Sequence, residues 1–312
     1  MKILLTGATG FVGRAVNENL KEYSVNLTSR KAPTDFPDNF YIKTISDLED
    51  FTDCLEDVDV VIHAAARVHQ MNNQSSDPMS DYIETNCSGT LNLARQAVKS
   101  GVKRFIFIST IKVNGEKTFK GSPFRFDDPR NGSDPYSLSK SKAEEGLIEI
   151  SRESELEFTI IRPPLIYGPG VKANFRSLMM LAAKNLPLPF GNFNNKRSFV
   201  SLKNLVDLIL TCINHPKAAN QVFLVSDDYD ISTSELVIKL SVAFGNKPRL
   251  MKVNLNFLKA IAKVLNKRDV IDRLCDDLQI DIEHTKKTLN WKPIISINEG
   301  IKLCTQEFTN DE

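Results

Sequence analysis

The sequence predicts an α/β fold, a doubly wound parallel sheet followed by a smaller mixed α/β lobe at the C-terminal end. Short apolar runs alternate with segments of helical periodicity over the first half of the chain, which is typical of parallel strands joined by helices. A glycine-rich turn follows the first apolar run, and Pro and Gly cluster just after residue 162. We therefore divide the chain into a sheet domain, 1–165, and a lobe, 166–312, with segments near 197–225 returning to the sheet.

The composition indicates a soluble globular protein. Hydrophobic residues make up 41% of the 312 residues and charged residues 25%, which are ordinary values for such proteins. With 40 basic and 39 acidic residues the net charge is +1, so no overall field attracts nucleic acid or an anionic membrane surface. No apolar run approaches the ~20 residues of a membrane span. We expect neither a nucleic-acid partner nor a membrane partner.

The cysteines predict neither a disulfide framework nor a metal site. The 5 cysteines are scattered, and no C-x-x-C motif or Cys/His cluster occurs. Reduced thiols fit a cytoplasmic protein best. The apolar run at residues 1–5 is too short for a secretory signal, and Gly7 interrupts it. These observations predict a cytoplasmic protein without a metal.

The first strand is expected at Lys2–Thr6, and a glycine-rich turn follows it. The turn reads Gly7-Ala8-Thr9-Gly10-Phe11-Val12-Gly13, a G-x-x-G-x-x-G motif that leads into a helix through Leu20. The first glycine permits the tight bend, the second lets the backbone approach a pyrophosphate, and the third allows close helix packing. Free N–H groups at the helix start can bind the phosphates. In this setting the motif predicts a Rossmann-type dinucleotide site.

The second strand, 24–28, ends at Ser29-Arg30-Lys31. A site for NAD normally has an acidic residue at this point, which bonds the ribose 2′-hydroxyl, whereas an Arg accommodates the 2′-phosphate of NADP. No Asp or Glu occurs here before Asp35. The pattern favours NADP(H) and leaves NAD(H) possible. The alternative interpretation is that Arg30 is only a solvated loop charge.

The remaining elements of the sheet domain follow in order. We expect strands at 41–45, 58–63, 105–108 and 158–161, and a long helix over 81–99 that contains Asn86. Ala64-Ala65-Ala66 directly follow one of these strands. Small residues at this point let a flat ligand lie against the backbone, although close packing of a helix on the sheet explains the alanines equally well.

A Tyr and a Lys stand four residues apart at the start of a predicted helix over 137–149. Tyr136 and Lys140 would share one face of that helix. An ammonium beside a phenol favours the phenolate, so we expect Lys140 to lower the pKa of Tyr136 and make it an acid and base usable near neutral pH. Such a pair alone occurs often by chance. Here the pair follows a dinucleotide motif, and the hydroxyl residues Ser109 and Thr110 stand at the end of a predicted strand before it. This combination favours a functional pair.

The lobe mixes helices with short strands. We expect helices at 175–184, 203–214, 232–244 and 255–265, and strands near Phe190, Phe199 and Val222. Trp291 is expected to pack against this lobe.

Several motifs together resemble one family over essentially the whole chain, an extended short-chain dehydrogenase/reductase of the nucleotide-sugar epimerase/dehydratase family. The motifs are the three glycines of the turn, Asp47-Leu48, His63-Ala64-Ala65-Ala66, Asn86, Ser109-Thr110, Tyr136 with Lys140, Arg162-Pro163, Tyr167-Gly168-Pro169-Gly170 and Leu289-Asn290-Trp291-Lys292-Pro293.

The resemblance implies a role for each matching residue. Tyr136 would be the catalytic acid and base, Lys140 would hold the nicotinamide ribose and tune Tyr136, and Thr110 would be the hydroxyl partner and a substrate contact. The implied cofactor-binding residues are Gly7, Thr9, Gly10, Phe11, Val12, Gly13, Arg30, Asp47, Leu48, Ala64, Ala65, Ala66, Asn86, Ile108, Tyr136, Lys140 and Pro163.

The resemblance also implies a UDP-sugar as the substrate and a homodimer formed through the helices after Asn86 and Tyr136. The substrate-binding residues would be Asn174 and Phe175 at the diphosphate, Pro189 in the segment that contacts uracil, Arg197 at a phosphate, and Arg273 as a candidate second phosphate-binding Arg.

Two segments are similar to a bacterial branch that makes N-acetylated deoxyhexoses for surface polysaccharide. They are 67–69 and 110–116, where Asn114 replaces an aromatic residue that is common in the family. That branch includes enzymes that reduce a UDP-4-keto-6-deoxy-N-acetylhexosamine to UDP-N-acetylquinovosamine, and UDP-hexose 4-epimerases. A second departure is the segment 201–204, which replaces a usual Asp-containing segment.

The leading hypothesis is a 4-ketoreductase that uses NADPH, because Arg30 and Lys31 favour that cofactor. The alternative is a UDP-glucose or UDP-N-acetylglucosamine 4-epimerase, which shares the same three catalytic residues. A 4,6-dehydratase is disfavoured because it needs an acid and a base directly after Thr110, where Ile111 and Lys112 stand. A non-catalytic cofactor-sensing regulator is disfavoured because the three catalytic residues are intact.

Overall fold

The structure, a computed structural model, describes residues 1–31, 37–68, 77–255, 258, 260, 263 and 268–310. Asp35 and His69 lie outside these residues, and so does most of the helix predicted over 255–265.

Seven parallel strands form the central sheet in the order β3-β2-β1-β4-β5-β6-β9, so the predicted fold class is confirmed. The strands are β1 (Lys2–Thr6), β2 (Ser24–Ser29), β3 (Phe40–Ile42), β4 (Val60–His63), β5 (Arg104–Ile108), β6 (Glu157–Arg162) and β9 (Gln221–Leu224). The strand order reverses between β1 and β4, and ligands of such sheets bind at this switch point.

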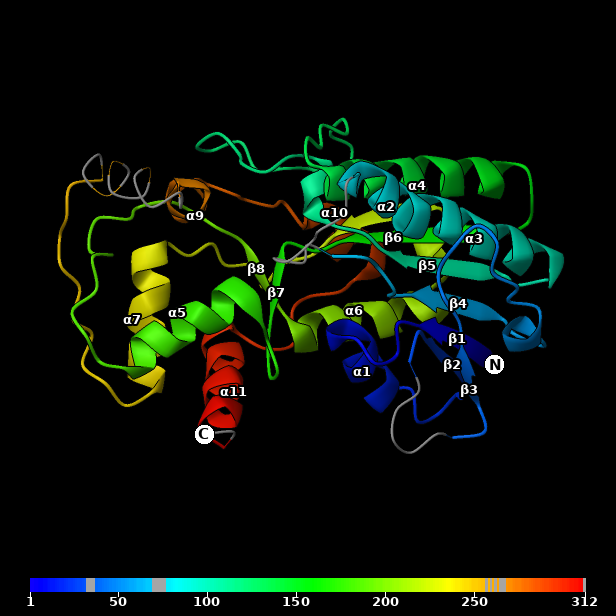
Figure 1. The fold of residues 1–312 in the computed structure, drawn as a ribbon, viewed down its shortest axis with the longest axis horizontal. Helices are drawn as coiled ribbons and strands as arrows, with labels where there is room; N and C mark the ends of the chain where they lie inside the picture. Colours follow the sequence, from blue (N-terminus) through cyan, green and yellow to red (C-terminus); the bar gives the residue numbers. More distant parts are fainter. Residues whose placement is uncertain are drawn as a thin grey trace.

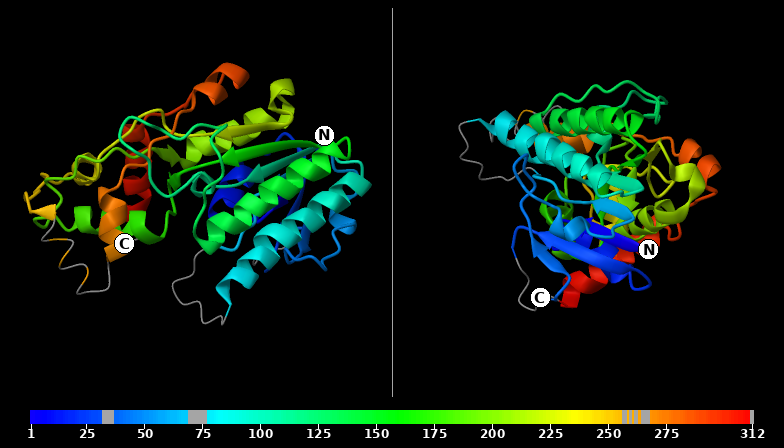
Figure 2. Two further views of the ribbon diagram at one scale, coloured as in Figure 1. Left: turned by 90° about the horizontal axis from the view of Figure 1, so that it is seen from above. Right: turned by 90° about the vertical axis from the view of Figure 1, so that its right-hand side faces the viewer.

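Helices cover both faces of the sheet (Figures 1 and 2). One face carries α1 (Phe11–Glu18) and α6 (Leu202–Asn214), and the other carries α3 (Gly89–Lys99) and α4 (Pro135–Arg152). Successive residues of β1 alternate between the two cores: Ile3 and Leu5 pack on one side and Leu4 on the other. A short helix α2 (Pro78–Ile83) continues through a π-helical turn (Glu84–Ser88) into α3.

The helix that carries Tyr136 and Lys140 begins earlier than the sequence pattern predicted. Asp134 caps α4, because its side chain accepts the N–H groups of Tyr136 and Ser137 while Ser137 bonds back to the Asp134 backbone. Pro135 then occupies the first helical position, where its missing N–H costs nothing. This cap fixes the direction in which the helix leaves the loop beside the sheet.

The lobe lies beyond the carboxyl ends of the strands, on the left in Figure 1. It contains a two-stranded parallel sheet, β7 (Leu165–Tyr167) with β8 (Phe199–Ser201), and an aromatic core in which Tyr167 stacks on Phe175 at 5.1 Å. Its helices are α5 (Ala173–Ala183), α7 (Thr233–Ala243), α9 (Arg268–Cys275) and α11 (Ile297–Asn310). No strand forms at Phe190; instead Leu188 makes an isolated bridge to Leu250.

Two segments after residue 166 belong to the sheet. Helix α6 packs on one face, and β9 pairs with β6 as the seventh strand; α10 (Glu283–Leu289) packs near β9. The boundary between 165 and 166 stays a prediction.

The prediction for Trp291 is wrong: its indole N–H donates to Asp207 on α6 at 2.7 Å, and its ring joins the core under the sheet. A buried indole needs an acceptor for its N–H group, and Asp207 provides that acceptor on α6.

Within the described ranges, no helix is long and apolar enough to cross a membrane. In the same part of the chain, no group of three or more His, Cys, Asp or Glu side chains is arranged to hold a metal ion.

Candidate active site

The glycine turn between β1 and α1 is too tightly packed for side chains. Gly7 has φ +70°, and a Cβ built there would lie 2.8 Å from the backbone of Ala65. A Cβ at Gly13 would lie 2.1 Å from the carbonyl oxygen of Gly7. The turn is therefore a bare backbone surface against Ala65, and Gly10 opens α1 without a side-chain cap. Such a surface fits a dinucleotide pyrophosphate.

The end of β2 carries hydroxyl groups where an NAD site normally has a carboxylate. The hydroxyls of Thr9 and Ser29 hydrogen-bond to each other at 2.7 Å, and Arg30 is exposed beside them. Beyond β3, the Asp47 backbone N–H donates to Glu84 at 3.2 Å, and the Leu48 side chain is 91% exposed. That the adenosine binds at this end of the sheet stays a prediction from the sequence.

Asn86 joins the loop after β4 to helix α4. It is buried; its amide oxygen accepts the N–H of Arg67 at 2.8 Å, and its amide nitrogen donates to the carbonyl of Arg67 and to the hydroxyl of Ser139, both at 3.0 Å. The loop that begins with Ala64–Ala66 is thereby held at a fixed height above the sheet.

Lys140 is buried beneath the candidate site. Its Nζ donates to the carbonyl oxygen of Ile108 at 2.9 Å and lies 4.2 Å from the centre of the Phe107 ring. Burial lowers the pKa of Lys140 to about 7, and the negative charge of Glu144 partly opposes this effect. At neutral pH the side chain is therefore only partly protonated.

The expected effect of Lys140 on Tyr136 is not what the structure gives. The pKa of Tyr136 is raised, chiefly by burial, with the charges of Asp134 and Tyr82 adding to it. A lowered pKa would require a permanent ammonium beside the phenol. In the fold the amine bonds to Ile108 and loses much of its charge, while Asp134, needed as the helix cap, places a carboxylate next to the ring.

Thr110 and Pro163 are brought together at the carboxyl ends of β5 and β6. The Ile111 N–H donates to the Pro163 carbonyl at 2.9 Å, and the Thr110 hydroxyl accepts the N–H of Lys112 at 3.3 Å. The Lys112 ammonium pairs with Asp134 at 3.1 Å and thereby joins this segment to the start of α4. Thr110, Tyr136 and Lys140 thus come from two elements that are tied to each other directly.

Tyr82 packs edge-on against Tyr136, with ring centroids 6.2 Å apart. Its side chain is buried, and its hydroxyl has no hydrogen-bond partner among the residues that the structure describes. A buried hydroxyl without a partner costs free energy, because it gives up its bonds to water.

Replacing Tyr82 with Phe should therefore leave the free energy of unfolding unchanged or raise it, by up to ~1–3 kcal/mol. The matched control is Tyr167→Phe, because the Tyr167 hydroxyl is also buried but donates to Asp227 at 2.6 Å. That variant should lose ~1.5–3 kcal/mol, the usual worth of a hydrogen bond to a charged group. Urea denaturation measures both values. An equal loss in the two variants would show that the Tyr82 hydroxyl is satisfied.

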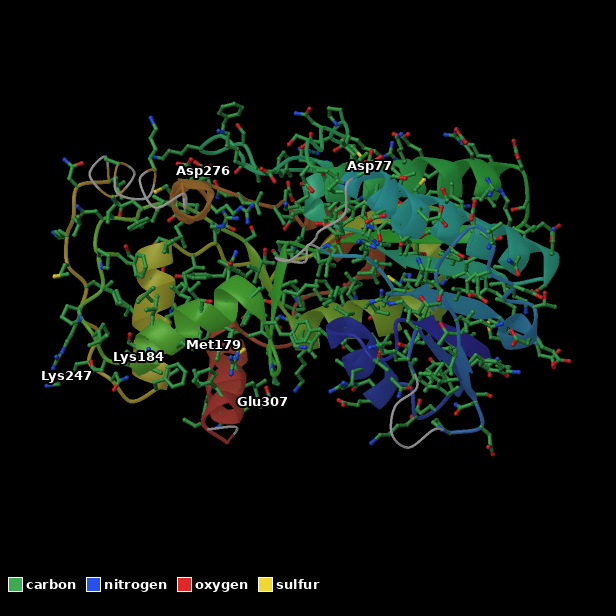
Figure 3. The ribbon with its side chains drawn as sticks, in the orientation of Figure 1. Asp77, Met179, Lys184, Lys247, Asp276 and Glu307 are labelled. Atoms are coloured by element: carbon green, nitrogen blue, oxygen red, sulfur yellow. The ribbon has the colours of Figure 1, made fainter. Side chains whose placement is uncertain are left out.

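The two candidate phosphate-binding arginines meet in the lobe. The Arg197 guanidinium donates to the carbonyl of Arg273 at 2.8 Å and to that of Asp276 at 3.0 Å (Figure 3 labels Asp276). Burial lowers the pKa of Arg197, the charge of Asp276 opposes this shift, and the charge of Arg273 lowers the pKa further. The charge of Asp277 also opposes the shift, so carboxylates as well as two guanidinium groups lie in this region.

The other predicted substrate residues have unequal exposure. Asn174 is exposed at the start of α5 and Pro189 is partly buried, whereas the Phe175 ring is 4% exposed and stacks in the aromatic core. The Phe175 side chain therefore serves the packing of the lobe.

Glu144, the buried carboxylate one helical turn beyond Lys140, is not among the residues predicted from the sequence. The signal was present in the spacing, because Tyr136, Lys140 and Glu144 follow one another at intervals of four residues and so share one face of α4.

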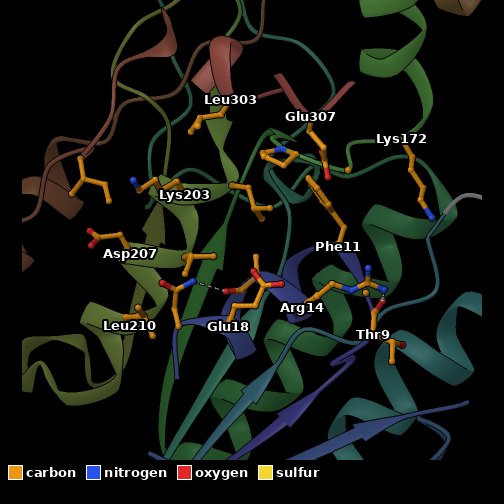
Figure 4. Close-up of a pocket in the computed structure, with 18 residues that line it drawn as sticks. Thr9, Phe11, Arg14, Glu18, Lys172, Lys203, Asp207, Leu210, Leu303 and Glu307 are labelled. Carbon is orange, nitrogen blue, oxygen red and sulfur yellow. Dashed lines mark hydrogen bonds between the residues drawn. The ribbon is translucent and has the colours of Figure 1, made fainter. Parts of the chain in front are cut away.

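A cavity of about 610 Å³ lies beside the glycine turn, between α1, α6 and α11 (Figure 4). Phe11, Arg14, Lys172, Lys203 and Glu307 are among the residues that line it. Neither Tyr136 nor Lys140 lines this cavity, so it adjoins the candidate site without containing the reacting groups.

Comparison with known proteins agrees with this arrangement. A model of the "NAD dependent epimerase/dehydratase family" matches residues 3–226. A UDP-glucose 4-epimerase of Vibrio cholerae is 50% identical over 98% of this chain and 95% of the relative.

Solved structures show the same fold. The UDP-glucose 4-epimerase of Thermotoga maritima with UDP-glucose has a TM-score of 0.77 and 24% identity, covering 100% of this chain and 99% of that one. The UDP-glucuronic acid 4-epimerase of Bacillus cereus in complex with NAD has a TM-score of 0.78 and 19% identity, covering 99% of each chain.

The family model spans most of the chain, and the Vibrio cholerae relative is similar along nearly its whole length. The chain therefore belongs to the NAD dependent epimerase/dehydratase family, the extended short-chain dehydrogenase/reductase enzymes.

Proposed function

We propose that the protein is a UDP-hexose 4-epimerase that inverts the hydroxyl at C4 of UDP-glucose or UDP-N-acetylglucosamine. The observation that carries this proposal is the full-length similarity, at 50% identity, to a UDP-glucose 4-epimerase. It supports the epimerase alternative better than the ketoreductase that the sequence argument placed first. The arrangement of Thr110, Tyr136 and Lys140 serves either reaction.

In this proposal the chain holds the sugar and moves one proton. A bound nicotinamide cofactor would take the hydride from C4 and later return it. Tyr136 accepts the proton of the C4 hydroxyl as the ketone forms and gives a proton back when the ketone is reduced on its other face. Thr110 bonds the same oxygen, and Lys140 binds the nicotinamide ribose. Arg197 and Arg273 bind the diphosphate, so the hexose can turn over while the nucleotide stays in place.

The test is incubation of the purified protein with UDP-glucose and with UDP-N-acetylglucosamine, followed by separation of the 4-epimers. Conversion in both directions without net consumption of cofactor supports the epimerase. Absence of conversion, with oxidation of NADPH on a UDP-4-keto-6-deoxy-N-acetylhexosamine, would establish the reductase instead.

The reductase stays a second candidate because of one structural feature. The end of β2 presents the hydroxyls of Thr9 and Ser29 and the cation of Arg30, and Lys31 is exposed next to them. A carboxylate at this point would repel a 2′-phosphate, whereas a guanidinium can bond it bidentately. We infer that the cofactor site accepts NADP(H) as well as NAD(H).

This inference about the cofactor gives a prediction. Wild-type protein should bind NADPH at least as tightly as NADH, and Arg30→Ala should weaken NADPH by about tenfold, the worth of a charge-assisted hydrogen bond, with little effect on NADH. Ser29→Asp should shift the preference toward NADH. Fluorescence titration of the three proteins measures the affinities. Equal weakening of both cofactors by Arg30→Ala would place the 2′-phosphate elsewhere.

We also propose that the protein acts in the cytoplasm as a homodimer that pairs through α3 and α4. These two helices lie side by side on the outer face of the sheet (Figure 2). Sedimentation at several concentrations measures the state, and a monomer throughout would remove this proposal.

A further inference from the structure

Glu144 is the hub of a buried polar network behind the candidate site. Its side chain is fully buried, and its carboxylate accepts hydrogen bonds from Ser109, Arg162 and Arg130. One carboxylate oxygen accepts the Ser109 hydroxyl at 2.6 Å and the Arg162 Nε at 3.0 Å. The other accepts the Arg162 Nη2 at 2.6 Å and the Arg130 Nε at 3.1 Å. Four donors on three different segments thus converge on one carboxylate of α4.

These donors adjoin the residues that carry the chemistry. Ser109 directly precedes Thr110 at the end of β5, and Arg162 directly precedes Pro163 at the end of β6. Arg162 also donates to the side chain of Asn114 at 3.0 Å. The network therefore fixes the height of two strand ends against the helix that carries Tyr136 and Lys140.

Charge in this region is unbalanced toward positive. Arg162 is buried and Arg130 is partly exposed, and Lys140 lies one helical turn from Glu144. His63 on β4 also interacts with Lys140: burial lowers the pKa of His63 well below its usual value, and the charge of Lys140 adds to this.

The His63 ring bonds Thr6 at 2.7 Å and Thr90 at 2.9 Å. It stays neutral in the range where Lys140 titrates. Glu144 therefore supplies the negative charge that Lys140 faces.

We propose that Glu144 is a positioning residue of the active site, which holds the strand ends beside Thr110 and Pro163 in register with α4 and provides the counter-charge for Lys140. This inference rests on the proposed epimerase reaction. Glu144 touches neither substrate nor cofactor in this role; it acts through Lys140 and Thr110.

The consequence is a pH effect with a definite sign. The reaction uses the protonated form of Lys140, whose pKa is about 7. Activity therefore falls as pH rises through that value. Removing the charge of Glu144 lowers the pKa of Lys140 further, so the alkaline limb of the kcat/KM profile should move to lower pH by about one unit, as for loss of a nearby opposite charge.

The experiment measures kcat/KM for epimerisation from about pH 5.5 to 9.5, a range that brackets such a limb, in wild type, Glu144→Gln and two controls. Glu144→Asp keeps the charge but shortens the side chain, so the limb should stay in place. Because the shorter carboxylate cannot reach both Ser109 and Arg162, kcat should fall on the order of tenfold or more.

The second control, Asp227→Asn, tests whether any buried carboxylate has this effect. Asp227 is buried in the lobe and accepts bonds from Tyr167 and from Ser201 and Asn204. Its replacement should lower the melting temperature and leave the limb unmoved. The proposal is overturned if folded Glu144→Gln has its alkaline limb at the same pH as wild type. It is also overturned if Asp227→Asn shifts the limb as far as Glu144→Gln does.

Glu144→Gln leaves the Arg162 guanidinium buried without its counter-charge, which itself costs stability. If that variant does not fold, Glu144→Asp decides, because wild-type kcat in this variant contradicts the positioning role. Wild-type turnover of UDP-hexoses is measured first and tests the proposed function by itself. If the wild type is active and the alkaline limb of Glu144→Gln does not shift, the proposed role of Glu144 is rejected and the proposed epimerase function is not.

Discussion

Replacing Tyr136 with Phe should reduce the kcat of epimerisation by about 10²–10⁴-fold, the usual contribution of a positioned general acid and base. The pKa of the phenol is raised by burial and by Asp134 and Tyr82, so the phenolate that accepts the C4 hydroxyl proton forms only at a cost in free energy at neutral pH. Phe can neither accept that proton nor return one to the C4 ketone. Phe keeps the ring and its edge-on contact with Tyr82, so cofactor affinity and the melting temperature should stay near wild type.

Tyr82→Phe is the matched control for this experiment. It removes from the neighbouring ring a phenolic hydroxyl that has no partner among the described residues, so kcat should change by less than about tenfold. Single-turnover kinetics with bound cofactor separate loss of chemistry from loss of binding. Near-normal turnover in Tyr136→Phe would remove Tyr136 from the mechanism and direct attention to Tyr82.

Replacing Gly13 with Ala should weaken cofactor binding by about a hundredfold, the order of effect of a ~1 Å misplacement in a binding site. The added Cβ would lie 2.1 Å from the Gly7 oxygen and 2.8 Å from the Gly7 carbonyl carbon. Both are backbone atoms of the turn that approaches the pyrophosphate, and the turn is itself packed against Ala65. The turn must therefore shift or the helix must move away from it.

Gly146→Ala provides the control for Gly13→Ala. Gly146 is also a helical glycine, but the Cβ added there would meet the side chain of Leu91, at 2.6 Å. A side chain can rotate where backbone cannot, and α4 lies away from the glycine turn. This variant should change stability and leave cofactor affinity unchanged in a fluorescence titration. Equal cofactor affinities in the two variants would mean that the turn does not set the cofactor site.

Much of the fold could be predicted because its signals are local. The bounds of β1 agree with the prediction residue for residue, and α6 begins one residue before its predicted start. A buried parallel strand is a short apolar run, and a covered helix shows its apolar residues at helical spacing. Strand ends were less certain: β3 stops at Ile42 rather than at residue 45, because β2, the strand that it pairs with, ends at Ser29.

The sequence by itself determined which chemical groups meet on one element. The spacing of Tyr136 and Lys140 places both on one face of α4, and the glycine spacing dictates a turn whose backbone is bare. These are consequences of helix geometry and of the missing Cβ, so they need no knowledge of distant residues.

Only the tertiary structure decided how those groups behave. The pKa of Tyr136 is raised rather than lowered, Trp291 packs under the sheet, and Glu144 joins Ser109 and Arg162 across 35 and 18 residues of chain. Burial and long-range pairing set the electrostatic energy of a titratable group. Neither is written in the spacing of neighbouring residues, because both depend on which segments the completed fold brings into contact.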